Sequence, residues 1–511
     1  SRACVAFSSC LPILVLTAAA HPDGTTMTGR EASGNTRRSA ATLPVDWPLA
    51  FAWIRRGHAT FRNPAMRPSH QLIPCSQPPS PTRPASTVAS RAAFGGGFAG
   101  SLALLLITAR LAAASAAESI DLEASASAVA ALQAFLEVPP GERAAIHDEP
   151  FAVVPLSRDD AAAARALLID DHAARIRESR DAEMQAGCLR LGDLAMPFTI
   201  KVFGAKPERG RSMVVSMHGG GGAPKTVNDS QWENQKRLYT LDEGVYVVPR
   251  APTDSWNLWH QAHIDPLFDR LIENLVVFEE VDPDRVYLMG YSAGGDGVFQ
   301  LAPRMADRFA AAAMMAGHPN ETSPLGLRNL PFTIHMGGND AAYNRNQLAA
   351  AWKDQLAALR AKDPEGYPHL VTIHAGKGHW MDREDAAALP WMMQYRRNPF
   401  PERVIWKQDD VTHSRFYWLA VDDEQRQARS DIVASRSGQS IDVASEEVAC
   451  VQVLLNDEMV DLDEPVVITS AGEPIVTTVV SRTIRILART LAERGDPRSM
   501  YSGELEVTLP E

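Results

Sequence analysis

The chain has 511 residues, of which 45% are hydrophobic and 22% charged, a balance that is ordinary for a soluble globular protein and excludes disorder throughout. Because this length exceeds that of one compact domain, we expect two or three folded units. The sequence contains no uninterrupted apolar run long enough to cross a bilayer comfortably.

The net charge of −12 is unevenly divided along the chain. Residues 1–117 hold eleven Arg, no Lys and three acids, a net charge of +8, which leaves −20 for the remainder. Since a strongly acidic region repels phosphate backbones, we expect no nucleic-acid partner.

The basic front end has the layout of a targeting segment. The apolar run Phe94–Thr108 is followed by the small residues of Ala112–Ala117, which is a signal-peptide pattern. The run is short and Arg110 interrupts it, so cleavage is favoured over a membrane anchor. A second apolar run, Leu11–Ala20, leaves the processing site open. Either run predicts export to the periplasm or the medium, with a disordered leader and signal peptide over residues 1–118 and no stable membrane insertion afterwards.

Residues 119–190 have a helical pattern. The segment is Ala-rich and includes a charged stretch from Asp159 through Arg180, so we predict a small helical cap or brace.

In residues 191–400, short apolar runs alternate with longer helical stretches. This alternation predicts an α/β fold, with a mainly parallel sheet covered by helices on both faces. The predicted strands are Phe198–Phe203, Met213–Met217, Gly244–Pro249, Arg285–Met289, Ala311–Met315, Phe332–Met336 and Leu370–His374.

The pattern changes again at the prolines Pro399 and Pro401. Residues 401–511 contain short alternating stretches such as Arg415–Val421 and Glu504–Thr508. We therefore predict a β-rich C-terminal domain after this boundary.

The strongest chemical signal is a Gly-Tyr-Ser-Ala-Gly motif at Gly290–Gly294, between a predicted strand and a predicted helix. This is the Gly-x-Ser-x-Gly pattern in its strand–turn–helix setting, where the glycines permit a tight turn that exposes the serine hydroxyl. We predict Ser292 as a nucleophile. Asp296, in the first turn of the helix, is expected to interact with backbone N–H groups rather than to serve as a rival triad acid.

A glycine-rich loop, His218–Pro224, follows the predicted strand Met213–Met217. Its position suits an oxyanion loop, because residues without a Cβ atom allow close approach of backbone N–H groups. We predict that Gly220 and Gly221, with Ala293 after the serine, provide the oxyanion hole.

A nucleophilic serine needs a base and an acid that orients the base, in the chain order Ser, Asp, His for this motif. Asp340 and His379 follow the last two predicted strands of the sheet. Both therefore lie at carboxyl ends of strands, where an open α/β sheet gathers its site. We predict a Ser292, Asp340 and His379 triad.

With these motifs, the segment from Pro197 to Pro399 resembles the α/β-hydrolase superfamily. It is most similar to the polyhydroxybutyrate-depolymerase-like, dienelactone-hydrolase-like and prolyl-oligopeptidase-like bacterial esterases. The resemblance implies the roles given above for the triad and the glycine loop, and it implies no metal and no organic cofactor. By analogy with secreted depolymerases, the C-terminal domain is expected to bind a polymer.

Two further expectations concern the segment after the predicted strand Gly244–Pro249. We hypothesise that Trp259 and His260 contact substrate, although core packing explains an aromatic residue there equally well. His260, His263 and Asp265 have the composition of a metal cluster but lack a His-Glu-x-x-His pattern, so we expect no zinc site.

The sequence therefore predicts a serine hydrolase that cleaves carboxylic esters, small or polymeric, through an acyl-enzyme. Two alternatives remain open: a prolyl-oligopeptidase-like serine peptidase, and a noncatalytic polymer-binding protein with a vestigial hydrolase domain.

Overall fold

The computed structural model describes residues 120–510. The predicted leader and signal peptide lie outside the described residues. Across the described part of the chain, no helix is both long enough and apolar enough to span a membrane.

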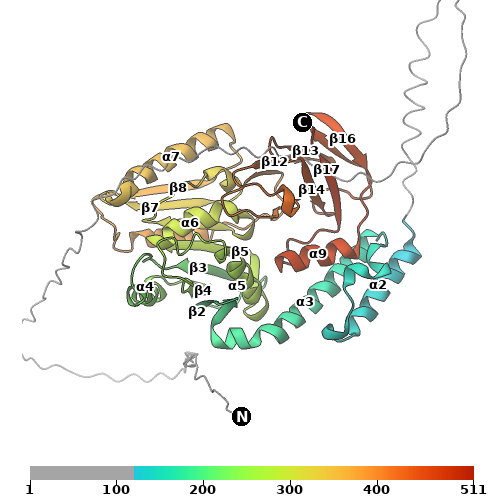
Figure 1. The fold of residues 1–511 in the computed structure, drawn as a ribbon, viewed down its shortest axis with the longest axis horizontal. Coiled ribbons are helices and arrows are strands. Elements are labelled where there is room, and N and C mark those ends of the chain that lie inside the picture. The colour runs from blue at the N-terminus through green and yellow to red at the C-terminus, as the bar shows by residue number, and fades with distance from the viewer. Residues whose placement is uncertain (1–119, 511) are drawn as a thin grey trace, which may run out of the picture. The chain divides into compact units, whose positions relative to one another are not determined.

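The centre of the fold is a sheet of eight strands in the order β1-β2-β4-β3-β5-β6-β7-β8 (Figure 1). Strand β2 is antiparallel to both of its neighbours, and all other neighbouring pairs are parallel. The strands are β1 (Cys188–Leu191), β2 (Leu194–Phe203), β3 (Arg211–Met217), β4 (Gly244–Pro249), β5 (Val281–Tyr291), β6 (Ala311–Met315), β7 (Phe332–Gly337) and β8 (His369–His374). All seven predicted strands are present, and the predicted α/β class is confirmed.

Strand β1 corrects the expectation that the helical pattern runs to residue 190. Helix α3 ends at Gly187, which adopts φ 58° and whose N–H donates to the carbonyls of Glu183 and Met184. Glycine in this left-handed conformation is a common helix stop. The chain then enters β1 and pairs antiparallel with β2.

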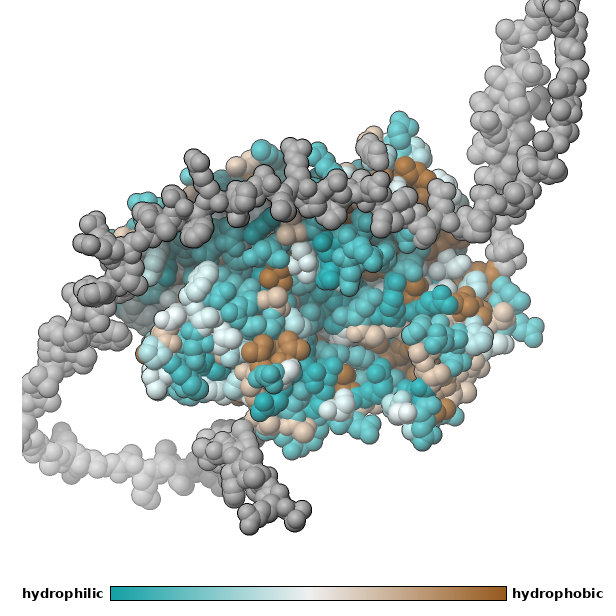
Figure 2. Space-filling model, viewed as in Figure 1, coloured by the Kyte–Doolittle hydropathy of each residue, from teal (hydrophilic) through white to brown (hydrophobic). Residues whose placement is uncertain are grey.

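Helices cover both faces of the sheet. Alternate residues of a strand point to opposite faces and pack into two separate hydrophobic cores. Met213 and Val215 of β3 belong to the core formed with three helices, whereas Val214 belongs to the core on the opposite face. The first core includes α5 (Ile264–Phe278), α6 (Ala293–Arg304) and α7 (Arg345–Lys362), and the second includes residues of α4 (Lys225–Leu238) and α8 (Ala388–Met392). The outer surface seen in Figure 2 is mostly hydrophilic, with small scattered apolar patches.

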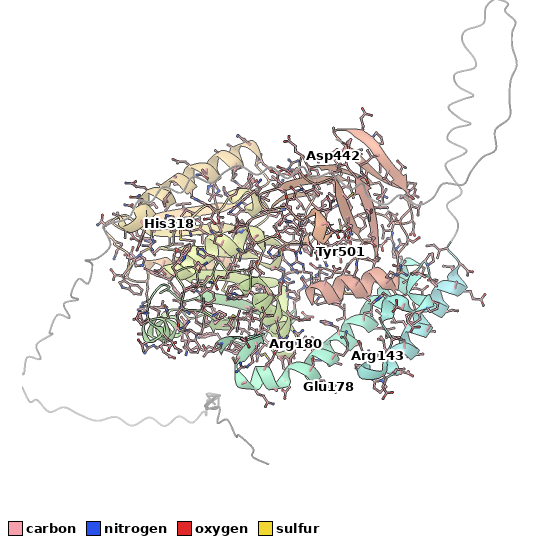
Figure 3. The ribbon with its side chains drawn as sticks, in the orientation of Figure 1. Arg143, Glu178, Arg180, His318, Asp442 and Tyr501 are labelled. Atoms are coloured by element: carbon pink, nitrogen blue, oxygen red, sulfur yellow. The ribbon has the colours of Figure 1, made fainter. Side chains whose placement is uncertain are left out.

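Two helices precede the sheet, α2 (Leu122–Glu137) and α3 (Arg158–Ala186). Helix α3 contacts α5 of the hydrolase region and α9 (Ile484–Arg494) near the C-terminus. Arg180 on α3 (Figure 3) donates hydrogen bonds to Glu273 and Asn274 of α5. The segment therefore braces the rest of the structure, as its pattern predicts.

The C-terminal region contains a four-stranded sheet, β10-β11-β14-β17, and a five-stranded sheet, β16-β15-β13-β12-β9. Their bounds are β9 (Arg403–Lys407), β10 (Arg415–Phe416), β11 (Leu419–Ala420), β12 (Asp431–Ser437), β13 (Ser440–Ala444), β14 (Cys450–Leu455), β15 (Val466–Ser470), β16 (Glu473–Thr478) and β17 (Gly503–Thr508). The predicted β-rich region is confirmed, and Glu504–Thr508 lies in β17.

The stretch Arg415–Val421 is not the single strand that its alternation predicts. It forms a hairpin, β10 and β11, in which Phe416 pairs with Leu419 and the chain reverses at Tyr417, φ 51°. Both turn residues, Tyr417 and Trp418, are buried, so this turn lacks the glycine and polar residues that mark most two-residue hairpins.

Candidate active site

Ser292 lies at a sharp turn between β5 and α6. Its backbone adopts φ 59° and ψ −121°, a strained conformation for a residue with a side chain. A Cβ atom on Gly290 would lie 2.2 Å from the carbonyl oxygen of Gly294, and one on Gly294 would lie 2.2 Å from that of Met217. The two glycines of the motif are therefore required by close backbone approach, which is the reason the motif predicts this turn.

The structure brings the three predicted triad residues together. His379 Nε2 lies 2.9 Å from Ser292 Oγ, and His379 Nδ1 lies 2.7 Å from Asp340 Oδ2. The Asp340 side chain is 2% exposed, whereas that of His379 is 45% exposed, so the carboxylate is shielded from water while the imidazole is reachable. In this geometry Nδ1 faces the carboxylate and Nε2 faces the serine hydroxyl, which is the arrangement of a Ser-His-Asp triad.

The loops that carry Asp340 and His379 are fixed to each other. The Asn339 N–H donates to the Lys377 carbonyl at 2.8 Å, and the Gly338 N–H donates to the His374 carbonyl at 2.9 Å. Because β7 and β8 are parallel neighbours, both loops begin at the same edge of the sheet.

Tyr291, the residue before Ser292, also holds the loop that carries His379. Its hydroxyl donates to the His379 carbonyl at 2.6 Å and accepts from the Met381 N–H at 3.1 Å. Sequence reasoning assigned no role to Tyr291, because only the position of this side chain next to a distant loop reveals one.

The glycine loop lies beside the serine. A Cβ atom on Gly219 would lie 3.1 Å from the Cβ of Ser292. Gly220 and Gly221 have φ values of 114° and 82°, in the region that favours glycine. The Gly221 N–H already donates to Asn228 Oδ1 at 2.8 Å, whereas Ala293 begins α6, whose first N–H groups have no partner within the helix.

Asn228, on α4, is the residue that orders this loop and that the sequence analysis missed. It is fully buried, and besides accepting from Gly221 it donates to the Ala223 carbonyl at 3.1 Å and to Asp254 at 2.9 Å. An asparagine in the first turn of the helix after a glycine loop is a signal that could have indicated it.

The structure places Trp259 in the core, not on a substrate surface. Its side chain is fully buried, and its indole N–H donates to the His218 carbonyl at 2.9 Å. This corrects the expectation that Trp259 contacts substrate. His260 is partly exposed and its ring centroid lies 5.6 Å from that of Trp256. Burial lowers the pKa of His260 to about 4, so it is neutral at pH 7.

Three large aromatic side chains are exposed on the loops of the site. Trp256 is 66% exposed, and its backbone carbonyl lies 2.9 Å from where a Cβ of Gly221 would be. Trp380 directly follows His379, is 46% exposed, and has its ring 5.7 Å from that of Tyr291. Tyr343, three residues after Asp340, is 68% exposed, with the Arg345 guanidinium 4.9 Å from its ring.

Asp296 accepts a hydrogen bond from the backbone N–H of His318 at 2.6 Å. His318 (Figure 3) lies on the loop after β6, so Asp296 binds a backbone N–H as expected, but on a neighbouring loop and not on its own helix. Burial raises the pKa of Asp296.

The trio His260, His263 and Asp265 does not gather around a shared point. Asp265 forms a buried ion pair with Arg304 at 2.5 Å and a second contact with His413 at 2.9 Å. Among residues 120–510, one group of three side chains could hold a metal ion, and it consists of Glu321, Asp409 and Asp410.

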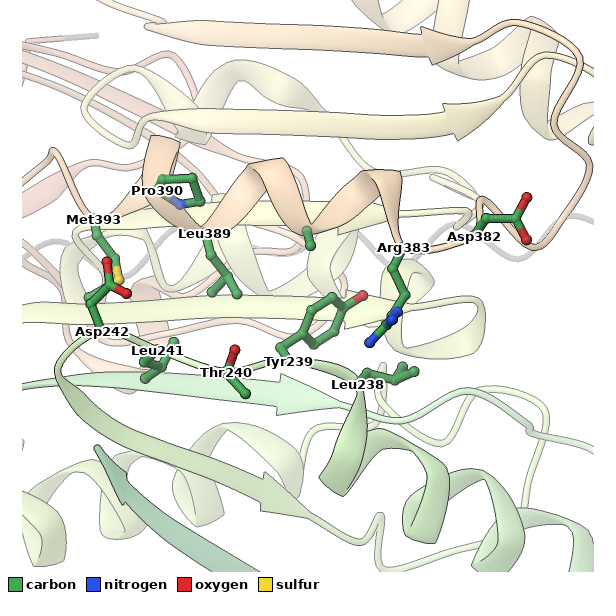
Figure 4. Close-up of a pocket in the computed structure, with 11 residues that line it drawn as sticks. Leu238, Tyr239, Thr240, Leu241, Asp242, Asp382, Arg383, Leu389, Pro390 and Met393 are labelled. Atoms are coloured by element: carbon green, nitrogen blue, oxygen red, sulfur yellow. The ribbon is translucent and has the colours of Figure 1, made fainter. Parts of the chain in front are cut away.

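A cavity of about 550 Å³ lies on another part of the hydrolase domain (Figure 4). It lies between the α4–β4 connection and the segment from Asp382 to Met393, with Arg383 at one end and Asp242 near the other. Ser292, Asp340 and His379 do not line this cavity, so it lies outside the candidate active site.

Comparisons with known proteins agree with the fold. Residues 250–392, which contain Ser292, Asp340 and His379, match the model of the dienelactone hydrolase family. A protein named as an esterase, NocK of Nocardia uniformis subsp. tsuyamanensis, is 31% identical over 132 residues. That alignment covers 24% of this chain and 38% of the relative, so the chain spans well under half of the relative's length.

Solved structures that resemble the chain include a thermostable esterase, which is 18% identical with a TM-score of 0.32. That alignment covers 41% of this chain and 62% of the esterase. A feruloyl esterase module from Clostridium thermocellum is 15% identical with a TM-score of 0.31, and the alignment covers 41% of this chain and 86% of the module. Because these scores are low, the assignment depends on the strand order, the serine turn and the family match. On those grounds the resemblance seen in the sequence is confirmed: the central domain is an α/β-hydrolase domain, and its residues 250–392 match the dienelactone hydrolase family.

Proposed function

We propose that the protein is a serine hydrolase that cleaves carboxylic esters through an acyl-enzyme. The observation that carries the proposal is the continuous hydrogen-bond chain from Asp340 through His379 to Ser292, with the serine held at a strained turn. A buried acid, an oriented imidazole and a partly exposed hydroxyl are the three parts of an activated nucleophile.

The reaction starts when Ser292 Oγ bonds to the acyl carbon while His379 Nε2 takes its proton. The alcohol leaves with that proton, and the acyl group stays on the serine. Water then attacks the acyl-enzyme as His379 accepts a proton from it, and transfer of that proton to Ser292 releases the acid. Asp340 keeps Nδ1 protonated and stabilises the imidazolium in both halves.

The tetrahedral intermediates require donors for an oxyanion. We propose the N–H groups of Ala293 and Gly220 for this role, with Gly219 added because it adjoins Ser292. Gly221, which the motif also suggested, is the weaker candidate because Asn228 already accepts its N–H.

The relative NocK is named as an esterase, which favours an ester over a peptide as the substrate. Exposed Trp256, Tyr343 and Trp380 offer aromatic surface to an apolar or aromatic group of either kind of substrate. His260, beside Trp256, stays in the proposal as a substrate contact. The peptidase and noncatalytic alternatives are outcomes of the test below.

The test is steady-state hydrolysis of a matched ester and anilide by the wild type and by Ser292→Ala. We expect ester hydrolysis in the wild type, at least about a thousandfold loss in the variant, and little anilide cleavage. Anilide cleavage at comparable efficiency would favour the peptidase. Unchanged hydrolysis in Ser292→Ala, or none in folded wild type, would contradict the proposal.

A further inference from the structure

The loop that carries His379 begins and ends at two side chains that contact each other. His374 is the last residue of β8, and Glu384 is the first residue of the short 3-10 helix Glu384–Ala387. His374 Nδ1 lies 3.1 Å from Glu384 Oε2. His379 lies midway between these two residues in the sequence. One contact between side chains therefore closes the loop at its base.

The hydrogen bonds around His335 decide which of its ring nitrogens carries a proton. His335 lies on β7 and is buried. The Thr333 hydroxyl donates to the Leu370 carbonyl at 2.9 Å, so towards His335 Nε2, at 3.3 Å, it can only accept. Burial lowers the pKa of His335 to about 4, which leaves one ring proton at pH 7. That proton lies on Nε2, and Nδ1 is an acceptor.

His374 has an acceptor on each side of its ring. Its Nε2 lies 3.1 Å from the unprotonated His335 Nδ1, and its Nδ1 faces the Glu384 carboxylate. The Lys377 ammonium and the His374 imidazole lower the pKa of Glu384, so its carboxylate is ionised at pH 7. Both contacts of His374 are hydrogen bonds only when the ring carries two protons. The contact with Glu384 is then a charge-assisted hydrogen bond between an imidazolium and a carboxylate.

The backbone of the loop is open in one part and strained in another. A Cβ atom on Gly376 or on Gly378 would meet no non-neighbouring atom of the described residues within 4 Å. Asp382 and Arg383, drawn in Figure 4, directly precede Glu384 and adopt φ values of 54° and 63°. Residues other than glycine keep this conformation only where surrounding contacts impose it. A contact at Glu384 therefore holds the strained end of the loop.

The contact with His374 has the best-defined geometry of the side-chain contacts that close the loop. Lys377 also pairs with Glu384, at 2.9 Å, and with Asp382, at 2.8 Å, but both carboxylates are at least half exposed. Ion pairs between flexible side chains at the surface are weak, because water screens them. The His374 ring, in contrast, is buried and held by His335.

We propose that His374 and Glu384 are positioning residues for the reaction. Their contact closes the loop of residues 375–383 and thereby sets the position of His379 Nε2 relative to Ser292 Oγ. The inference rests on the proposed esterase function, because it needs His379 to act as the base. A displacement of about 1 Å in a reacting group can lower a rate by about 100-fold, so a contact at the base of the loop is able to control turnover.

The experiment is steady-state hydrolysis of a p-nitrophenyl ester by the full chain, as wild type and as Glu384→Ala. We expect kcat to fall about 10- to 100-fold while KM changes less than about twofold, because the variant misplaces His379 and leaves the substrate-binding side chains in place. The Tm should stay within about 2 °C of the wild type, since Glu384 is half exposed. A lower Tm with unchanged kcat would make the contact merely structural and overturn the proposal.

Three further variants separate this contact from a general effect of charge. Glu384→Gln keeps an oxygen that accepts from His374, so its kcat should lie between those of Glu384→Ala and the wild type. His374→Gln combined with Glu384→Ala should lower kcat no further than the larger single loss, because both remove one contact. Glu365→Ala, at an exposed glutamate between α7 and β8, should keep the wild-type kcat. Losses that multiply in the double variant would overturn the proposal.

The outcomes distinguish the positioning role from the esterase function. Folded wild type that neither hydrolyses the ester nor reacts with a fluorophosphonate would overturn both proposals. An active wild type with an unchanged kcat in Glu384→Ala would leave the esterase function standing and overturn the positioning role alone. This result decides even if His374→Gln fails to fold, because Glu384→Ala changes only a half-exposed side chain.

Discussion

Trp256 and Trp259 are three residues apart, yet they lie in opposite environments. Trp256 is 66% exposed beside the glycine loop, whereas Trp259 is fully buried and bonded to the His218 carbonyl. Trp256→Ala should raise KM about tenfold for an ester with an aromatic acyl group, because it removes aromatic contact area, and should leave Tm nearly unchanged. Trp259→Ala should lower the free energy of unfolding by about 3–5 kcal/mol.

Steady-state kinetics and urea unfolding of both variants check this pair. Trp256→Phe is the matched control, since it keeps an aromatic ring and its KM should lie between those of Trp256→Ala and the wild type. A Trp256→Ala protein with unchanged KM for aromatic and aliphatic esters alike would remove Trp256 from the binding surface.

The positions of single site residues were predictable where the backbone geometry of the site requires a short sequence motif. Ser292 follows from its two glycines, and Asp340 and His379 follow from chain order and strand ends. The burial of a side chain was not predictable in the same way, because the sequence around Trp259 is equally compatible with a core and an exposed position. Trp259 is buried because it packs against Gly297 and its indole N–H donates to the His218 carbonyl, and both residues are distant in sequence.

At the scale of elements, Asn228 of α4 links a helix to the glycine loop. Its side chain accepts from Gly221 and donates to Ala223 and Asp254. Asn228→Ala should loosen the loop and lower kcat by about 10- to 100-fold with a smaller change in KM, because oxyanion donors act mainly in the transition state.

Asn234→Ala is the control, since Asn234 is an exposed asparagine on the same helix. Steady-state kinetics of both variants check the prediction. Equal kcat values for Asn228→Ala and the wild type would mean that the loop keeps its shape without this side chain.

The strands of the main sheet were predictable because each is a short apolar run, several of them followed by glycine or by a loop. Strand β1 was missed because only four residues, Cys188–Leu191, follow a long helix. The β10–β11 hairpin was missed because its turn, Tyr417 and Trp418, consists of buried aromatic residues that take the place of turn formers. In both cases tertiary pairing, and not local preference, decides the structure.

At the scale of the whole molecule, a buried ion network joins the hydrolase domain to the C-terminal region. Arg397, with a side chain 2% exposed, pairs with Asp284 at 2.9 Å and with Asp496 at 2.6 Å. Burial alone would raise the pKa of Asp496, but the Arg397 and Arg308 guanidinium groups hold it well below its usual value.

Arg397→Met should lower the free energy of unfolding by about 3–5 kcal/mol, because it leaves two buried carboxylates without this partner. Arg209→Met, at an exposed arginine, should cost about 1 kcal/mol or less. Chemical unfolding of both variants at pH 7 checks the contrast. A cost for Arg397→Met no larger than for Arg209→Met would contradict the bridging role.

The Arg397–Asp496 ion pair predicts a pH dependence of the free energy of unfolding. A carboxyl whose pKa is lowered on folding stabilises the protein fully above its unfolded pKa of about 4, and this stabilisation is lost as the pH falls towards the folded pKa. The wild type should therefore lose stability below about pH 4 more steeply than Arg397→Met, in which Asp496 lacks its main partner. Parallel curves of stability against pH for the two proteins between pH 5 and pH 2 would contradict the stabilising role of the Arg397–Asp496 pair.

The central claim is that Ser292 is an activated nucleophile, and covalent labelling with a fluorophosphonate tests it without a choice of substrate. Intact mass followed by peptide mapping should show one adduct, on Ser292, that disappears in His379→Ala while the fold is retained. No adduct on folded wild-type protein, or an adduct that persists at the same rate without His379, would contradict the triad and leave the noncatalytic binding protein as the better account.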